Sequence, residues 1–289
     1  MLRRHSRALR TVYLTLVFSF MYVPIAVMAV FSFNESKSRT VFTGFTLDWY
    51  KNLFRNEMIL QSLAISLVVA LVSAGIATVI GTMAAIGINN MKRGARSVVL
   101  NISYMPVINP EIVTGVSLML LFVVYKNFAN GLFERLGITD AAGETVVLRV
   151  FGMATLLIAH ITFCLPYVIF NVSPKLRQMD VRMYEAALDL GCNPRQAFFK
   201  VVLPEIMPAV LSAFLICLTY SIDDFIISYF SSGTMQTLPI TIFSMTRKKV
   251  SPEINALSTI MFVVILAIIL LMNMADSRRE KRLSRRDAR

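Results

Sequence analysis

The sequence predicts an all-α, polytopic membrane protein with six transmembrane helices. Hydrophobic residues make up 56% of its 289 residues, and the mean hydropathy is +0.65, well above what a soluble domain carries. Six apolar runs are each long enough to supply a span of about 20 residues. The polar segments between them are short, so we expect one transmembrane domain that occupies residues 1–289.

The apolar runs cover residues 11–33, 62–88, 98–125, 150–172, 206–230 and 257–274. Proline interrupts the third run twice, at Pro106 and Pro110. Proline kinks or ends a helix, and interrupted helices often mark a transporter's pathway. Alternatively, the first part of this run is a short re-entrant or interfacial segment that precedes the true span. The residues leave both alternatives open.

Small residues recur every four positions along the second run, at Ser73, Ala77, Gly81 and Ala85. They share one helical face, and small side chains allow helices to approach closely in lipid. We therefore expect this helix to lie near the centre of the bundle.

Basic residues gather at alternate ends of the runs, which favours cytoplasmic N- and C-termini by the positive-inside rule. The strongly basic segment 275–289 is then a cytoplasmic tail. The net charge of +12 reflects this topology better than a nucleic-acid surface, because no basic patch with interleaved aromatic residues occurs. The expected environment is lipid, and nucleic acid is not an expected partner.

The sequence contains no phosphate-binding Gly-rich loop with Lys-Ser/Thr, no serine–histidine–acid pattern and no metal-ligand spacing. We therefore expect no catalytic residues, no metal site and no cofactor in this chain. Any ATP and Mg²⁺ would be bound by a separate subunit. Cys164, Cys192 and Cys217 are interpreted as small hydrophobic residues.

A charged stretch between the fourth and fifth runs, at about 177–205, predicts two short amphipathic helices. They would meet at a turn near Gly191, with Asn193-Pro194 starting the second helix. This stretch resembles the EAA loop of ABC-importer permeases, with matches at Glu185, Ala186, Ala187, Gly191, Leu203 and Pro204. The usual isoleucine of the pattern is replaced by Val201.

The resemblance implies a type I ABC importer (MetI-like) permease fold and a cytoplasmic loop that docks on an ATPase. It implies that Glu185 is a polar contact to the ATPase and that Gly191 forms the turn. Ala186 and Ala187 would permit close packing at this contact.

Three acidic residues lie within or at the edge of the apolar runs: Glu111, Asp223 and Asp224. An aspartate at the centre of a span costs about 2.5–3.5 kcal/mol, so such residues are candidates for the substrate pathway. On a continuous fifth helix the two aspartates would point about 100° apart, with one facing a cleft and the other a neighbour. A purely structural, hydrogen-bonded role is the alternative for all three. For His160 we expect a neutral, hydrogen-bonded side chain, with proton relay as the less favoured alternative.

Further motifs resemble the C-type permeases of spermidine/putrescine importers (PotC-like): residues 160–167 (HITFCLPY), 180–187 (DVRMYEAA), 221–224 (SIDD), 238–240 (LPI) and 251–257 (SPEINAL). The resemblance implies a polyamine permease of the bacterial inner membrane. The implied partners are a second homologous permease, two ATPase subunits and an extracytoplasmic polyamine-binding protein. The basic run Arg247-Lys248-Lys249 does not fit the family pattern. A permease for another small solute, or a six-span channel, remains the alternative.

Overall fold

The computed structural model describes residues 2–36, 41–137, 150–248, 252–267 and 270. These residues form helices and loops, with one isolated β-bridge between Asn34 and Phe45 and no strand among them. The chain divides into two compact units. One comprises residues 1–60 with 242–289, and the other comprises residues 61–241.

Five stretches of helix are long and apolar enough to cross a membrane. They lie in α1 (Leu2–Phe31), α3 (Glu57–Asn89), α5 (Glu111–Arg135), α6 (Met153–Gln178) and the stretch Pro194–Asp223. A shorter apolar helix, Pro252–Ala267, occupies the first part of the sixth apolar run. The rest of that run and the basic tail 275–289 fall outside the described residues, apart from residue 270. The all-α, multi-spanning class is confirmed.

The third apolar run contains two separate helices rather than one interrupted span. Helix α4 (Arg93–Ile108) ends before Asn109, whose backbone is extended, and Pro110 is the N-cap of α5. Pro106 lies inside the last turn of α4, whereas Pro110 follows the break. This arrangement supports the alternative in which a short segment precedes the true span.

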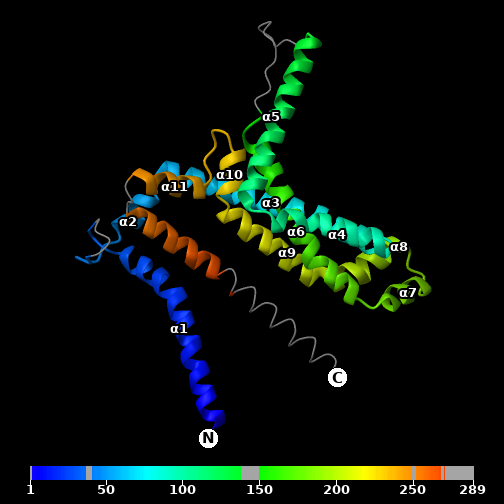
Figure 1. Ribbon diagram of the computed structural model, residues 1–289, viewed down its shortest axis with the longest axis horizontal. Helices are drawn as coiled ribbons and strands as arrows, with labels where there is room; N and C mark the ends of the chain where they lie inside the picture. Colours follow the sequence, from blue (N-terminus) through cyan, green and yellow to red (C-terminus); the bar gives the residue numbers. More distant parts are fainter. Residues whose placement is uncertain (1, 37–40, 138–149, 249–251, 268–269, 271–289) are drawn as a thin grey trace. The chain divides into compact units, whose positions relative to one another are not determined.

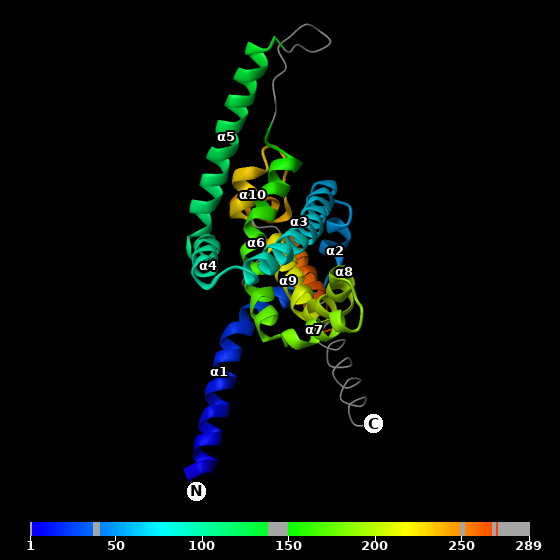
Figure 2. The same cartoon turned by 90° about the vertical axis from the view of Figure 1, so that its right-hand side faces the viewer.

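The second unit is built around the pair α6 and α9 (Leu203–Asp223), which run side by side in Figures 1 and 2. Cys164 of α6 and Cys217 of α9 are fully buried between them. Each thiol lies against the other residue's carbonyl oxygen, at 3.7 and 3.5 Å. These two cysteines are therefore small buried packing residues, as expected, whereas Cys192 is half-buried.

Helix α3 presents its small residues to the interior of the second unit. Ala70, Ala74, Ala77 and Ala85 have no exposed surface. At Gly81 a Cβ atom would come within 2.6 Å of the Val168 Cβ on α6. The absence of a side chain at Gly81 therefore sets how closely these two helices approach, and the predicted central position of this helix is confirmed.

The fifth apolar run was expected to be one helix through Phe230, and this expectation is wrong. Helix α9 ends at Asp223, Asp224 and Phe225 form a break, and the short helix α10 (Ile226–Ser231) follows. Helix α10 packs against α5 and α6, and its side chains Ile226 and Phe230 lie against Gly115 of α5. Helix α11 (Leu238–Lys248) comes next.

Two smaller elements complete the description of the chain. The short helix α2 (Asp48–Leu53) follows α1 and precedes α3 in the sequence. Within the basic run at the end of α11, the Arg247 guanidinium lies 5.3 Å from the centre of the Phe243 ring, and Lys249 is outside the described residues.

Replacing Gly81 by alanine should destabilise the fold, because the new methyl group would push α6 away from α3. Such overpacking typically costs about 1–3 kcal/mol. The matched control is Gly75→Ala in the same helix, where a Cβ atom would meet nothing within 4 Å. Thermal unfolding of the detergent-solubilised protein measures both variants, and equal melting temperatures would contradict this account of the contact.

Candidate functional site

The break between α9 and α10 is held by the side chain of Asp224. The residue has extended backbone angles (φ −64°, ψ 118°), and its carboxylate turns back onto the start of α10. It accepts hydrogen bonds from the backbone N–H groups of Ile227 at 3.2 Å and Ser228 at 2.7 Å. The carboxylate thus satisfies two N–H groups that have no partner inside the helix.

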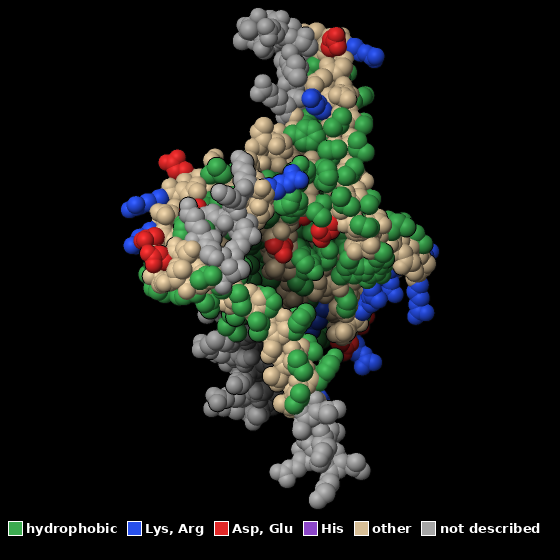
Figure 3. All heavy atoms as spheres, turned by 60° about the vertical axis from the view of Figure 1, so that its left-hand side comes forward, with side chains coloured by type: hydrophobic (Ala, Val, Ile, Leu, Met, Phe, Trp, Pro, Cys, Tyr) green, Lys and Arg blue, Asp and Glu red, His purple; other side chains and the backbone are tan. Residues whose placement is uncertain are grey.

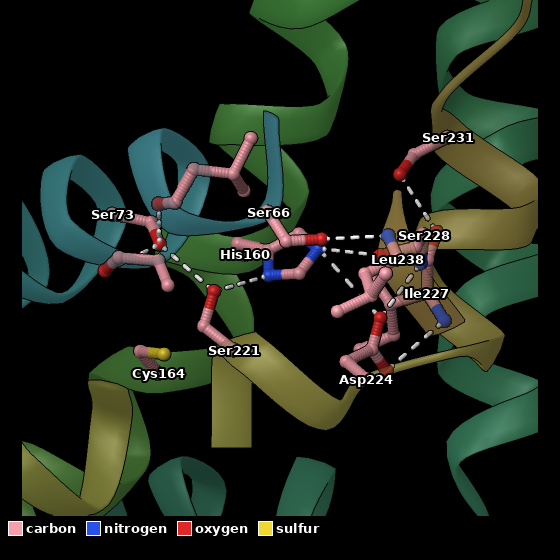
Figure 4. A network of polar contacts seen from close by, with 12 residues as sticks. Ser66, Ser73, His160, Cys164, Ser221, Asp224, Ile227, Ser228, Ser231 and Leu238 are labelled. Atoms are coloured by element: carbon pink, nitrogen blue, oxygen red, sulfur yellow. Dashed lines mark hydrogen bonds and ion pairs between the residues drawn. The ribbon is translucent and has the colours of Figure 1, made fainter. Parts of the chain in front are cut away.

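His160 of α6 lies at the centre of the buried polar network in Figure 4. Its Nδ1 is 2.7 Å from the Ser221 hydroxyl, and its Nε2 is 3.0 Å from the Ser228 hydroxyl. The same Nε2 lies 3.6 Å from a carboxylate oxygen of Asp224. The expected hydrogen-bonded histidine is confirmed, and its partners come from three segments of the chain.

The network continues onto α3, and a separate hydrogen bond joins α3 to the first residue of α11. The Ser221 hydroxyl lies 3.2 Å from that of Ser73. Further along α3, Ser66 accepts a hydrogen bond from the backbone N–H of Leu238 at 2.8 Å. Because buried polar groups are costly unless they are hydrogen-bonded, these bonds fix the relative positions of α3, α6, α9 and α10.

Asp223 is exposed, whereas its neighbour Asp224 is only 7% exposed. A continuous helix would point the two carboxylates in directions about 100° apart. In the structure, α9 ends between the two residues, so that Asp224 lies outside the helix. The structural role expected as an alternative therefore applies to Asp224, which has its partners inside the protein. Asp223 remains available on the surface.

Glu111, in the first turn of α5, is also exposed. Its carboxylate lies within electrostatic reach of Asp223. Within the described residues, neither acid forms an ion pair with a lysine or arginine. Figure 3 shows acidic side chains in the middle of a largely hydrophobic face.

Aromatic side chains lie beside these two acids. Tyr220 is one helical turn before Asp223 and is 42% exposed. Its ring centre lies 4.7 Å from that of half-buried Tyr167 on α6, and Tyr167 is within electrostatic reach of Glu111. Our reading of the sequence missed both tyrosines. The spacing of three residues between Tyr220 and Asp223 was the available signal.

The charged loop folds as expected into two short helices joined by a turn. Helix α7 (Val181–Asp189) is followed by its C-cap residue Leu190 and then by Gly191, which has φ +89°. The Gly191 N–H donates to Leu188 and the Cys192 N–H donates to Ala187, which is the hydrogen-bond pattern of a Schellman cap. The positive φ explains why glycine stands at this position.

The second helix of the loop has a well-formed start. It comprises α8 (Pro194–Ala197), and the π-helical segment η1 (Phe198–Val202) then leads directly into α9. The Asn193 side chain accepts from the Gln196 N–H at 2.8 Å, and the Gln196 side chain accepts from the Asn193 N–H at 3.1 Å. This capping box begins the helix at Pro194 as predicted.

The motif residues divide between the loop's surface and its interior. Glu185 and Ala186 are exposed, Ala187 is buried, and Gly191 is exposed. At the start of α9, Leu203 packs against the core of the second unit while Pro204 is exposed. Four large apolar side chains of the loop are also exposed: Val181, Met183, Leu190 and Phe199.

Exposed apolar side chains beside a glutamate are typical of a docking surface. Leu190 is 87% exposed at the tip of the loop. Where the loop meets the spans, an ion pair joins the end of α6 to the start of α9: Lys175 Nζ lies 2.7 Å from the Glu205 carboxylate. A force applied to the loop would therefore act on both helices.

The geometry is that of a multi-pass helical membrane protein, and the comparisons with known proteins identify its class. A family model for the binding-protein-dependent transport system inner membrane component matches residues 77–285. The chain belongs to this family, whose members are inner-membrane permeases.

Two relatives are similar over most of the chain. The putrescine transport system permease protein PotI of Escherichia coli (strain K12) is 38% identical over 254 residues, which are 87% of this chain and 84% of the relative. The spermidine/putrescine transport system permease protein PotC of Haemophilus influenzae is 35% identical over 264 residues, which are 91% and 94% of the two chains.

The fold is also shared with a solved structure. The crystal structure of a bacterial ABC transporter involved in the import of the acidic polysaccharide alginate contains a chain with a TM-score of 0.71 and 17% identity, and the match covers 96% of each chain. At this identity the likeness concerns the fold alone, which is that of type I ABC importer permeases.

Replacing Asp224 by alanine should destabilise the start of α10, because it leaves the buried N–H groups of Ile227 and Ser228 without their acceptor. Such a loss costs about 1–3 kcal/mol. Asp223→Ala is the matched control, since it changes the same residue type one position earlier at an exposed site. Thermal unfolding should show a lower melting temperature for Asp224→Ala alone. Equal effects would mean that the cap contributes little.

The docking role that the EAA resemblance implies predicts that replacing Gly191 by valine weakens docking of the loop, because a side chain at positive φ costs about 1–2 kcal/mol and would distort the turn. The control is Gly131→Val in α5, at a helical glycine where a Cβ atom would meet nothing within 4 Å. Co-purification of the ATPase subunits with the permease measures docking. Undiminished recovery with Gly191→Val would contradict a docking role for the turn.

Proposed function

We propose that this chain is one of the two permease subunits of an ABC importer for the polyamines spermidine and putrescine. The observation that carries the proposal is the pair of exposed carboxylates, Glu111 and Asp223, with no basic partner among the described residues. The names of the relatives PotI and PotC support the same substrate class.

A polyamine has the chemistry that this surface would attract. Its ammonium groups complement the carboxylates of Glu111 and Asp223. The faces of Tyr167 and Tyr220 suit both the ammonium groups and the methylene chain between them. Two carboxylates would also repel an anionic substrate.

Affinity along this path is expected to be modest. A pathway must bind its substrate well enough to admit it and weakly enough to release it. Two exposed carboxylates within reach of water meet this requirement better than a closed cage would. Asp224 is not part of this surface in our proposal: it supports the surface by holding the end of α9.

We place ATP binding and hydrolysis in partner subunits. The EAA loop, with Glu185 and Ala186 exposed and Leu190 at its tip, would dock on a dimer of cytoplasmic ATPases that hold ATP and Mg²⁺. A second, homologous permease would complete the pathway, and an extracytoplasmic polyamine-binding protein would deliver the substrate. Both termini would then be cytoplasmic.

The proposed mechanism is alternating access. Closure of the ATPase dimer would move the docked loop, and the Lys175–Glu205 pair would pass this motion to α6 and α9 together. The rigid-body rotation would open the pathway outward to accept the polyamine. ATP hydrolysis would return it to the inward-facing state.

The test is uptake of radiolabelled spermidine and putrescine by vesicles that carry the assembled complex. ATP and the binding protein are each present or omitted. Uptake that requires both would support the proposal and show which polyamine is preferred. ATPase activity without polyamine uptake would reject the substrate, and failure to assemble with an ATPase would favour a channel instead.

Removing either exposed carboxylate should slow polyamine uptake without affecting assembly. We expect Asp223→Asn and Glu111→Gln each to reduce uptake about three- to tenfold, because each removes an attraction worth about 1 kcal/mol or more. The double variant should lose more. The control is Asp48→Asn, which neutralises an exposed carboxylate outside the spans. Wild-type uptake by the double variant would remove these acids from the pathway.

A further inference from the structure

A compact segment follows the first span, and we call it the α1 cap. It comprises residues 32–36 and 41–54 and includes α2. The apolar part of α1, Arg10–Phe31, has 22 residues and is about 33 Å long at 1.5 Å per residue. That length matches the hydrocarbon thickness of a bilayer, so the cap begins where the chain leaves the hydrocarbon.

Hydrogen bonds of Asn34 hold the interior of the cap together. Asn34 has no exposed surface. Its Nδ2 donates to the Val41 carbonyl at 2.8 Å, and its Oδ1 accepts from the Thr43 N–H at 2.9 Å. The Asn34 carbonyl accepts from the Trp49 indole N–H at 2.7 Å. The tryptophan ring is therefore held in a fixed place.

Stacked rings and backbone bonds complete the cap. The Phe33 ring centre lies 5.3 Å from that of Phe45 and 5.2 Å from that of Tyr50. Two backbone hydrogen bonds join the two segments of the cap. The Thr46 N–H donates to the Phe33 carbonyl at 2.8 Å, and the Glu35 N–H donates to the Gly44 carbonyl at 2.9 Å. The cap is thus a built structure rather than a loose connection.

The outside of the cap combines large apolar side chains with polar ones, which include Glu35, Asp48 and Lys51. Its exposed large hydrophobic side chains are Val41, Phe42, Phe45, Leu47 and Phe54. Phe45 is the most exposed of them, at 69%. Residues 33–54 contain six aromatic residues (Phe33, Phe42, Phe45, Trp49, Tyr50 and Phe54), a density of roughly one in four against 10% for the whole chain. Contact between these large hydrophobic side chains and water would be unfavourable.

The neighbouring span indicates what covers this surface. None of the most apolar window of α1 is buried within its own unit, and the exposed apolar side chains of the cap follow this window along the chain. Tryptophan and tyrosine are enriched where a membrane meets water. Exposed Lys51, which pairs with Asp48 at 3.2 Å, and exposed Arg55, which directly follows the cap, lie close by in the chain, and such side chains can extend toward lipid phosphates.

We propose that the α1 cap lies in the interfacial layer of the bilayer, with its exposed aromatic side chains in the acyl–headgroup boundary. The occupant of this surface is lipid rather than a protein partner. The cap would fix the depth of α1 in the membrane, as interfacial aromatic anchors do. This proposal does not depend on the substrate of the importer.

The chain contains a single tryptophan, Trp49, so its fluorescence reports on the cap directly. The assembled complex is placed in nanodiscs of phosphatidylethanolamine and phosphatidylglycerol with bromine at a shallow or a deep acyl position. The same complex carrying Trp49→Phe provides the background from tryptophans of partner subunits. We expect shallow bromines to quench Trp49 strongly, deep bromines to quench it less, and aqueous iodide to quench it weakly.

If neither brominated lipid quenches Trp49, the proposal is overturned. Strong quenching by iodide would then place the ring in water, and weak quenching by iodide would mean that a protein partner shields it. A second measurement covers the case in which Trp49→Phe fails to assemble. A nitroxide on Phe45→Cys, in a Cys192→Ser background because the other two cysteines are buried, should collide more often with dissolved oxygen than with a water-soluble nickel complex. The reverse preference would place Phe45 in water and contradict the proposal.

Discussion

The break between α9 and α10, beside the candidate pathway, depends on one buried carboxylate. Asp224 caps α10 through the N–H groups of Ile227 and Ser228 and lies beside His160. A buried carboxylate without partners would be strongly unfavourable. The chain can therefore bury Asp224 only where the N–H groups of α10 and the His160 ring come together. That requirement ends α9 at Asp223 and sets α10 against α6. The hydroxyls of Ser73 and Ser221 extend the same constraint to α3.

Two adjacent residues of identical chemistry thereby take different roles. The backbone turns at Asp224, so its side chain points into the protein while Asp223 stays exposed at the helix end. The buried acid keeps the exposed one in place beside Tyr220. In the proposed function, the cost of burying one carboxylate is offset by its hydrogen bonds, and the other remains available to attract a cation.

The same two helices join the docking loop to this site. Helices α6 and α9 are held together by the Lys175–Glu205 pair near the loop, by Cys164 and Cys217 along their length, and by His160 and Ser221 at the far end. A pair held at three levels moves more readily as one body than by bending. This geometry suits a machine in which ATP hydrolysis takes place in one subunit and the substrate path lies in another.

The sequence by itself determined the features that depend on local chemistry. Hydropathy located the spans, the need for a positive φ placed the turn at Gly191, and the spacing of small residues identified the packing face that contains Gly81. Only the tertiary structure decided that the fifth run breaks after Asp223, that His160 meets Asp224, and that Tyr167 joins Tyr220 beside the acids. Hydropathy and helix propensity describe each segment alone, whereas burial and pairing depend on which helices come together. Asp223 and Asp224 are therefore equivalent in the sequence, and they differ in the structure because other helices place hydrogen-bond partners around Asp224 alone.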